Sequence, residues 1–311
     1  MDIVYMGSPD FSVPSLEQLV ESDILNVKGV ITRPDKPRGR GQKKQSTPIK
    51  KKALQLGCQV FTPENVNSSS FINQLQELAP EIIVVVAFGQ ILSRKVLETP
   101  DRGCVNLHAS LLPKYRGASP IHRAIMNGEE KTGVTVMFME ETLDTGDIIS
   151  QKEVVINRDD TAGDLHDRLA ETGAKLLVRT LIDIKQDNYT RKQQNDQEAS
   201  YADKLDNRAG EIDWNCSAED IYNFVRGLNP WPVAYTFWDD MRLKIWQVNI
   251  KDKNSKKGEP GEILQVSGEG LVVQTGCGII ELEKLQPAGK KKMDCVDFVN
   301  GYELEPGTVL G

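Results

Sequence analysis

Residues 103–147, GCVNLHASLLPKYRGASPIHRAIMNGEEKTGVTVMFMEETLDTGD, hold the pattern on which the fold and the site depend. The run from Gly103 to Leu107 predicts a short buried strand, in which residues two apart project from the same face. Asn106 and His108 are therefore expected side by side at the carboxyl end of that strand. In an open α/β sheet this end is where ligands bind.

A second apolar run, Val134 to Met139, leads into a polar loop that contains Asp144. Asn106, His108 and Asp144 suit the attack of an amine on a carbonyl. An amide or a protonated imidazole stabilises the oxyanion, at roughly 3 kcal/mol per donor, and a carboxylate assists proton removal. A lone histidine is as often structural, and the loop could be a simple turn. Three such residues at two strand ends favour a catalytic set.

The length of 311 residues predicts two domains. Hydrophobic residues make up 39% and charged residues 27%, as is typical of soluble globular proteins. The sequence has no apolar run long enough for a membrane span, and the first residues, MDIVYMGSPDF, read as a strand rather than a signal peptide. The five cysteines are scattered without a CxxC pair, which argues against zinc or a disulfide framework and favours the cytoplasm.

The net charge of −7 is unevenly distributed. From Arg33 to Lys52 there are nine basic residues and one acid, which leaves −15 on the rest of the chain. One dense basic segment on an acidic protein indicates a local contact with a polyanion. Prolines, glycines and the lack of aliphatic residues before Ile49 predict that residues 33–47 form a long mobile loop. A merely solvated charged loop is the alternative.

The stretch EIIVVVAFGQIL, residues 81–92, predicts a central parallel strand buried on both faces. The fold class expected for the N-terminal part is therefore α/β, a Rossmann-like open sheet with helices on both faces. A polar stretch predicts a linker over 189–207, between a domain of residues 1–188 and one of residues 208–311. Five short strands with glycine-rich turns predict a small β-barrel there, with the four tryptophans interpreted as core.

Four motifs in the central stretch form a specific combination: Asn106-Leu107-His108-Ala109-Ser110-Leu111-Leu112-Pro113, Tyr115-Arg116-Gly117, Pro120-Ile121 and Leu143-Asp144-Thr145-Gly146. This combination resembles the signature of the folate-dependent formyltransferases. The resemblance covers essentially the whole chain. Within that superfamily the closest match is the family that formylates methionyl-tRNA.

The resemblance implies transfer of the formyl group of 10-formyltetrahydrofolate to the free amino group of methionine on initiator methionyl-tRNA. The product would be N-formylmethionyl-tRNA for translation initiation. It also implies that the C-terminal domain is an open barrel of the oligonucleotide-binding type that assists tRNA binding. We expect a cytoplasmic monomer without a membrane partner. No metal is expected, since Asn is a poor ligand and only one histidine is near.

The resemblance places co-substrate binding on two segments of the chain. The residues concerned are Ser110, Leu111, Leu112 and Pro113, together with Phe88 and Gln90. In the family a basic insertion with a Gly-Arg-Gly core contacts the acceptor arm of the tRNA, and Gly39-Arg40-Gly41 matches it. Arg40 is expected to matter most for tRNA, supported by Arg38, Lys43 and Lys44.

Two alternatives remain open from the sequence. A formyltransferase acting on a nucleotide sugar or on glycinamide ribonucleotide, or a hydrolase of formyl-folate, would share the Asn, His and Asp but would have little need of the basic loop and the barrel. A non-catalytic RNA-binding protein with a degenerate fold would not need the three polar residues. Cys104 shares the strand face of Asn106 and is interpreted as a small buried residue, although a role in the site stays open.

Overall fold

A computed structural model describes residues 1–38, 43–267 and 270–311. The chain forms two compact units. The first comprises Met1–Pro120, Thr132–Val155 and His166–Ala202, and the second comprises Ile121–Lys131, Ile156–Leu165 and Asp203–Gly311. The boundaries predicted from the sequence, with a linker over 189–207, stay a prediction.

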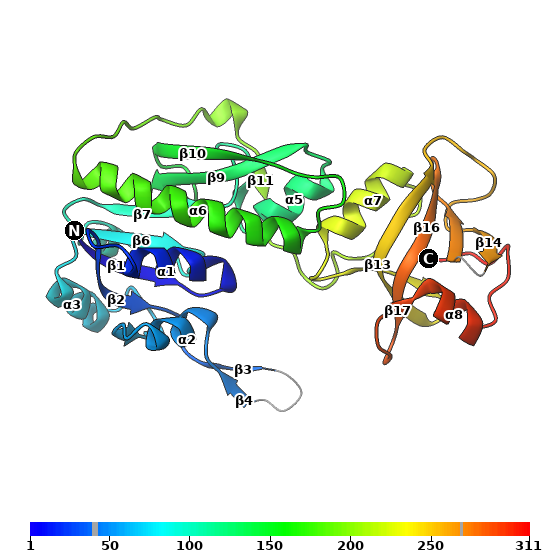
Figure 1. Cartoon of the computed structure of the whole chain (residues 1–311), viewed down its shortest axis with the longest axis horizontal. Coiled ribbons are helices and arrows are strands. Elements are labelled where there is room, and N and C mark those ends of the chain that lie inside the picture. Colours follow the sequence, from blue (N-terminus) through cyan, green and yellow to red (C-terminus); the bar gives the residue numbers. More distant parts are fainter. Residues whose placement is uncertain (39–42, 268–269) are drawn as a thin grey trace. The chain divides into compact units, whose positions relative to one another are not determined.

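A seven-stranded sheet organises the first unit (Figure 1). Its strands, in spatial order, are β10 (Ile148–Val155), β9 (Lys131–Phe138), β7 (Cys104–His108), β6 (Ile82–Val86), β1 (Asp2–Gly7), β2 (Asn26–Ile31) and β5 (Val60–Phe61). The five strands from β7 to β5 run parallel, whereas β9 is antiparallel to β7. All five residues of β6 are buried, as expected of a parallel strand covered on both faces.

Helices cover both faces of this sheet, so the predicted α/β class is confirmed (Figure 1). Phe71, Leu75 and Val96 pack into one core cluster with β1 and β6. On the other face, α6 (Ala162–Lys185) approaches the sheet closely, because a Cβ at Gly173 of this helix would lie 2.8 Å from Leu107 of β7. The helical elements of the first unit are η1 (Asp10–Ser12), α1 (Val13–Val20), α2 (Pro48–Gln55), α3 (Ser69–Leu78), α4 (Arg94–Leu97), η2 (Asp196–Glu198) and most of α6 (Ala162–Lys185).

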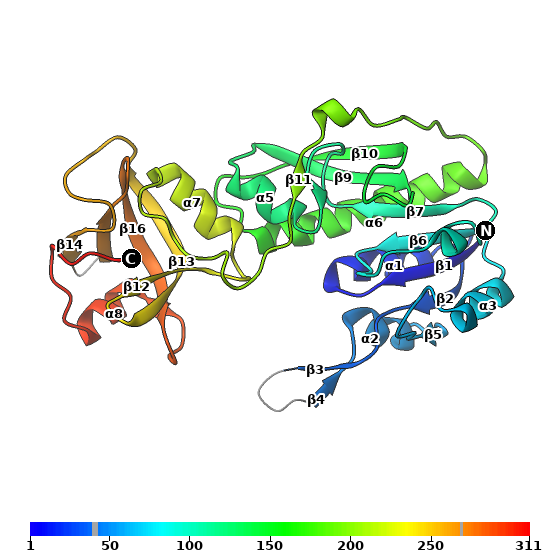
Figure 2. The same ribbon diagram turned by 180° about the vertical axis from the view of Figure 1, so that it is seen from behind.

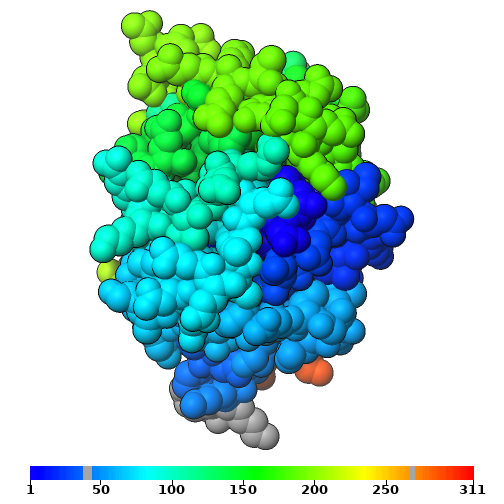
Figure 3. Space-filling view, turned by 90° about the vertical axis from the view of Figure 1, so that its left-hand side faces the viewer, coloured from blue at the N-terminus to red at the C-terminus, as the bar shows by residue number. Residues whose placement is uncertain are grey.

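Neighbouring parts of the chain cover the end of the sheet where β1 begins. Figure 3 shows the dark-blue N-terminal residues at this edge, between cyan and green parts of the chain. Met1 is buried, and its amino group donates to the carbonyl of Ile24 at 3.0 Å. The carboxyl ends of the parallel strands, where the predicted site lies, are at the other edge.

Two short strands of the basic segment pair with each other where the sequence predicts a long mobile loop, and we call this pair of strands the basic hairpin. β3 (Lys36–Arg38) and β4 (Lys43–Gln45) pair antiparallel and project from the first unit (Figures 1 and 2). Backbone pairing outside a core needs no apolar alternation, so the sequence carried no strand signal. Arg38, Lys43 and the exposed Lys44 lie in these strands. Arg40 lies outside the described residues.

Two contacts fix the base of this hairpin. The hydroxyls of Thr32 and Thr47 are 2.8 Å apart, and Lys50 Nζ lies 2.9 Å from the Asp35 carboxylate. The hydrogen bond from Lys50 lowers the pKa of Asp35. The single acid of the segment is thus paired at the base of the hairpin.

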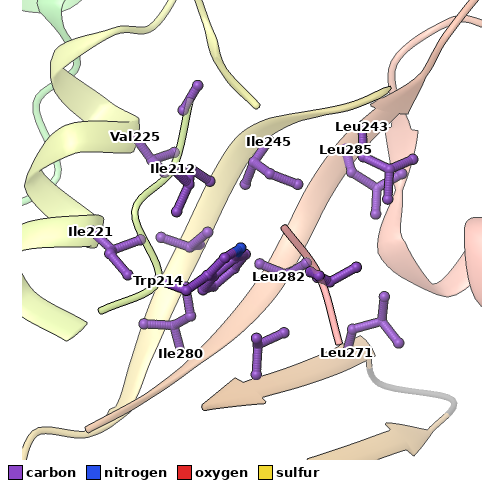
Figure 4. Packing of buried hydrophobic residues seen from close by; sticks show 14 of the residues in the cluster. Ile212, Trp214, Ile221, Val225, Leu243, Ile245, Leu271, Ile280, Leu282 and Leu285 are labelled. Carbon is purple, nitrogen blue, oxygen red and sulfur yellow. The ribbon is translucent and has the colours of Figure 1, made fainter. Parts of the chain in front are cut away.

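The second unit is an open antiparallel barrel, as predicted. The strand path is β12 (Ala234–Trp238), β13 (Met241–Asp252), β16 (Ile279–Pro287), β15 (Gly270–Gln274) and β14 (Ile263–Ser267), with β17 (Met293–Asp294) on β16. Its helices are α5 (Pro120–Met126), α7 (Ala218–Gly227) and α8 (Cys295–Gly301). Register shifts along β13 bend the sheet around the core, where Trp214, Ile221 and Leu282 pack together (Figure 4).

The interpretation of all four tryptophans as core is wrong for Trp231. Trp214 is buried, and its indole N–H donates to Thr236 Oγ1 at 2.9 Å. Trp231 is 50% exposed. Its position between Pro230 and Pro232 places it in a turn without a helix or strand face to turn inward.

No helix in the described part of the chain is both long and apolar enough to cross a membrane.

Candidate active site

Asn106 lies in the middle of the sheet, close to its carboxyl edge. It pairs with Val85 of β6 on one side and with Met137 of β9 on the other. Its side chain is half-buried, and its amide has no hydrogen-bond partner among the described residues. Alternation along β7 puts it on the same face as His108. A positioned amide N–H donor is therefore available on this face.

The ring of His108 is buried between two acceptors. Its Nε2 lies 2.9 Å from the carbonyl oxygen of Tyr115. A carbonyl only accepts, so Nε2 carries a hydrogen. Nδ1 faces Asp144 Oδ2 at 3.6 Å, an ion-pair distance rather than a direct hydrogen bond. A doubly protonated imidazolium thus has an acceptor facing each ring nitrogen.

Asp144 is 8% exposed and held in a left-handed backbone conformation, with φ of 56°. Its Oδ2 accepts a hydrogen bond of 2.8 Å from the backbone N–H of Gly117. A non-glycine residue in this conformation costs of order 1–3 kcal/mol and persists only where its surroundings hold it. The carboxylate is consequently fixed beside His108 by contacts on several sides.

His108 and Asp144 meet for a different reason from the one expected. Because β9 is antiparallel to β7, its carboxyl end lies beside Cys104 and not beside His108. The loop after β9 returns to the sheet, where the N–H of Phe138 donates to the carbonyl of Asp147 at 2.9 Å. The fold-back of residues 139–147, rather than a shared strand end, brings the carboxylate to the imidazole.

Gly146 makes this fold-back possible. A Cβ at this position would lie 1.9 Å from the carbonyl oxygen of Phe138, a backbone atom that cannot turn away. We expect Gly146→Ala to lower the free energy of unfolding by about 1–3 kcal/mol through overpacking, measured by urea denaturation. Gly301→Ala is the matched control, since no atom lies within 4 Å of its added Cβ. Equal losses in both variants would contradict the close approach.

A cavity of about 160 Å³ opens beside Asp144. Its lining residues include Gln90, Leu92, Met137, Met139, Leu143 and Asp144. Two apolar residues on its wall are unusually exposed, Ile91 at 79% and Leu143 at 66%. Sites for drug-sized ligands measure roughly 300–1,000 Å³. The cavity therefore fits one end of such a ligand, with the exposed apolar residues beside it.

The residues predicted to bind the co-substrate are differently placed. Gln90 lines the cavity, and its Oε1 accepts from the N–H of Val66 at 3.0 Å. Phe88 is buried in the core of the sheet. Ser110 is also buried, and its hydroxyl donates to the carbonyl of Lys114 at 2.6 Å. Of the six residues, Gln90 alone is among those that line this cavity, and their role stays a prediction.

The loop from Ser110 to Pro113 is held by polar contacts to β9 and β10. The hydroxyl of Thr135 donates to the carbonyl of Ser110 at 2.6 Å and accepts from the N–H of Leu112 at 3.2 Å. The carbonyl of Leu112 accepts from Gln151 Nε2 at 2.9 Å. Leu111 packs against β9 near Gly133. The loop is thus fixed next to His108 rather than free to adapt.

Sequence reasoning missed Gln194, which contacts the loop of Asp144, and Arg116, which contacts Gln194. Arg116 is 2% exposed, and its Nε and Nη2 donate to Gln194 Oε1 at 3.1 and 2.9 Å. Gln194 Nε2 in turn donates to the carbonyls of Asp144 and Gly146. Arg116 stood in a quoted motif without a role. Gln194 is one polar residue in a polar stretch, which gives no signal.

The other candidates lie outside this group. Cys104 is buried against α4, and burial raises its pKa to about 12, so it stays a neutral thiol near neutral pH. His122 contacts the carbonyl of Gly227, and His166 contacts Asp167. Among the described residues, no cluster of His, Cys, Asp and Glu has the arrangement of a metal site.

Comparison with family models assigns both parts of the chain. Residues 1–181 match the model described as formyl transferase, and residues 204–303 match the model described as formyl transferase, C-terminal domain. The chain is 54% identical to a methionyl-tRNA formyltransferase of Halothermothrix orenii, over the full length of both. It is 50% identical to a methionyl-tRNA formyltransferase of Moorella thermoacetica, covering all of this chain and 99% of the relative.

Solved structures show the same fold at lower identity. One is the sugar 3N-formyl transferase WlaRD, in the presence of dTDP and 5-N-formyl-THF. It is 21% identical with a TM-score of 0.68, over 94% of this chain and 99% of that chain. Another is HypX from Aquifex aeolicus in complex with tetrahydrofolic acid. It is 15% identical with a TM-score of 0.61, over 96% of this chain and 46% of that chain.

Proposed function

The chain belongs to the methionyl-tRNA formyltransferase family, and from this premise we propose that it transfers the formyl group of 10-formyltetrahydrofolate to the amino group of methionine on initiator methionyl-tRNA. The product, N-formylmethionyl-tRNA, serves translation initiation. One observation supports the chemistry most directly. Asp144, which lines a cavity, faces His108 at 3.6 Å, and alternation along β7 puts Asn106 on the same strand face as His108.

The first step is attack of the neutral methionyl nitrogen on the formyl carbon. The new C–N bond turns the formyl oxygen into an oxyanion. The unpartnered amide of Asn106 donates to that oxygen. The His108 imidazolium, held between Tyr115 and Asp144, adds positive charge next to it. Preorganised groups of this kind stabilise the transition state more than the substrate.

The second step moves one proton. The attacked nitrogen must lose a proton, and the tetrahydrofolate nitrogen must gain one when the C–N bond to the formyl carbon breaks. Asp144 Oδ2 is held by Gly117 and faces His108, whereas no described residue donates to Oδ1. We assign Oδ1, directly or through water, to accept the proton of the amine. Its return to the leaving nitrogen balances the reaction.

The co-substrate would place its reacting end in the cavity beside Asp144. The wall combines apolar Leu92, Met137 and Met139 with the polar Gln90, Glu140 and Glu141, and a flat ring system with polar edges needs both kinds of contact. The volume of about 160 Å³ leaves the rest of the molecule outside. The exposed Ile91 and Leu143 offer it apolar contact. Ser110 to Pro113 and Phe88 are not among the residues that line this cavity, and we propose that they support the residues that do.

The basic hairpin is the proposed contact for the acceptor arm of the tRNA, through Arg38, Arg40, Lys43 and Lys44. The pairing of Asp35 with Lys50 removes the only negative side chain from competition with phosphates. Binding that neutralises phosphates releases counterions, so affinity falls as salt rises.

We expect Arg40→Ala and Lys44→Ala each to raise KM for initiator methionyl-tRNA. Each should also reduce the slope of log affinity against log salt by about 1. The measurement is tRNA binding at a series of salt concentrations. Lys175→Ala, an exposed lysine on α6, serves as the control with an unchanged slope. Unchanged slopes in all three variants would remove the hairpin from the tRNA contact.

The proposal extends to the organisation of the chain. Residues 1–188 would carry catalysis, residues 208–311 would assist tRNA binding, and residues 189–207 would connect them. The enzyme is proposed to work in the cytoplasm as a monomer.

The direct test supplies 10-formyltetrahydrofolate and three acceptors in parallel. These are initiator methionyl-tRNA, uncharged initiator tRNA and an amino sugar nucleotide. The expected result is that initiator methionyl-tRNA is formylated on its methionine and that the other two acceptors are not formylated. Formylation of the sugar, or release of formate without a formylated product, would reject the proposed substrate.

A further inference from the structure

We infer that Gln194 is a positioning residue for Asp144, and that Arg116 fixes the orientation of its amide. This inference rests on the proposed function for its catalytic readout. Gln194 is 9% exposed and comes from the segment after α6, far along the chain from the loop it contacts.

The hydrogen bonds of Gln194 allow one orientation of its amide. Its oxygen accepts from two nitrogens of Arg116, and a guanidinium can only donate. The amide nitrogen must then face the other way, where the carbonyls of Asp144 and Gly146 lie at 2.9 and 2.8 Å. Both halves of the amide are satisfied only in this orientation.

Arg116 is itself clamped by the segment that carries Gln194. Its Nη2 lies 2.8 Å from Asp196 Oδ1. Its backbone N–H donates to the carbonyl of Ser200 at 2.8 Å, and β8 (Arg116–Gly117) pairs in parallel with β11 (Tyr201–Ala202; Figure 2). A buried guanidinium needs such partners, because an uncompensated buried charge is strongly destabilising.

These contacts fix both the backbone carbonyl and the side-chain carboxylate of Asp144. Gln194 grips its carbonyl, while Gly117, which follows Arg116, grips its carboxylate through a bond of 2.8 Å. The left-handed backbone at Asp144 requires this support. Without Gln194, Asp144 is expected to leave its place beside His108 part of the time.

The test compares Gln194→Met, Gln194→Glu and wild type. Methionine keeps the length of the side chain without its hydrogen bonds, and glutamate keeps the bonds from Arg116 but cannot donate to the two carbonyls. We expect both to lower kcat about 10–100-fold, as losses of supporting hydrogen bonds do, with KM for both substrates nearly unchanged.

A second readout does not depend on activity. The N–H of Gly117 is protected by its bond to Asp144, so its hydrogen exchange should be faster in both variants. Gln274→Met is the matched control. Gln274 is a buried glutamine of the second unit that donates to three carbonyls, and its loss should leave Gly117 exchange unchanged.

Lower kcat together with faster Gly117 exchange supports the inference. Faster exchange in an enzyme whose wild type transfers no formyl group would reject the proposed function and leave the positioning intact. Unchanged Gly117 exchange would overturn the positioning whatever happens to kcat. Faster Gly117 exchange with wild-type kcat would overturn the catalytic part of the inference, because formyl transfer would then not need Gln194 to position Asp144.

Discussion

Asp144→Asn is expected to lower kcat for formyl transfer by about 10²-fold or more, because general acid–base groups contribute this much. Asparagine keeps the size of the side chain, and its oxygen can still accept from Gly117. Its amide nitrogen would then face His108 Nδ1, which must accept rather than donate. The ring would keep one proton, on Nε2, and the imidazolium would be lost.

Steady-state kinetics at saturating concentrations of both substrates measure this effect. Thermal unfolding should change little, since volume and one hydrogen bond are retained. Asp187→Asn is the control, an exposed carboxylate paired with Arg102 on the surface. Wild-type kcat in Asp144→Asn would exclude the carboxylate from the proton transfer.

Asn106→Ala is expected to lower kcat by about 10²–10³-fold, the usual effect of losing one oxyanion donor. KM for 10-formyltetrahydrofolate should stay close to that of wild type, because the donor acts on charge that develops only in the transition state. The amide has no partner among the described residues, so its removal leaves no buried group unpaired.

The comparison of kcat with KM decides the role of Asn106. A raised KM with normal kcat would mean that the amide binds substrate and transition state equally. Loss of cooperative unfolding would point to a structural role instead.

The elements that the sequence predicted best are those with strong apolar patterns. The run from Ile82 to Val86 could only be a strand buried on both faces, and its place at the centre of the sheet followed. The direction of β9 did not follow. An apolar run reads the same in a parallel and in an antiparallel strand, so the fold-back that delivers Asp144 stayed hidden.

Polar contacts between segments that are far apart in the chain could not be predicted from the sequence either. The buried Arg116 looks like any surface arginine, because what buries it, Gln194 and Asp196, lies about eighty residues later. The hairpin of β3 and β4 is held by backbone pairing, which leaves no side-chain pattern. Asn106 and His108, by contrast, could be put on one face from strand periodicity alone.

This site is proposed to transfer a formyl group to the amino group of methionyl-tRNA. Single-turnover kinetics test it most directly, with enzyme in excess over 10-formyltetrahydrofolate and initiator methionyl-tRNA, for wild type, Asp144→Asn and Asn106→Ala. We expect stoichiometric N-formylmethionyl-tRNA from wild type and a much slower transfer step in both variants. Equal transfer rates in all three proteins, or formyl release to water without formylated tRNA, would contradict it.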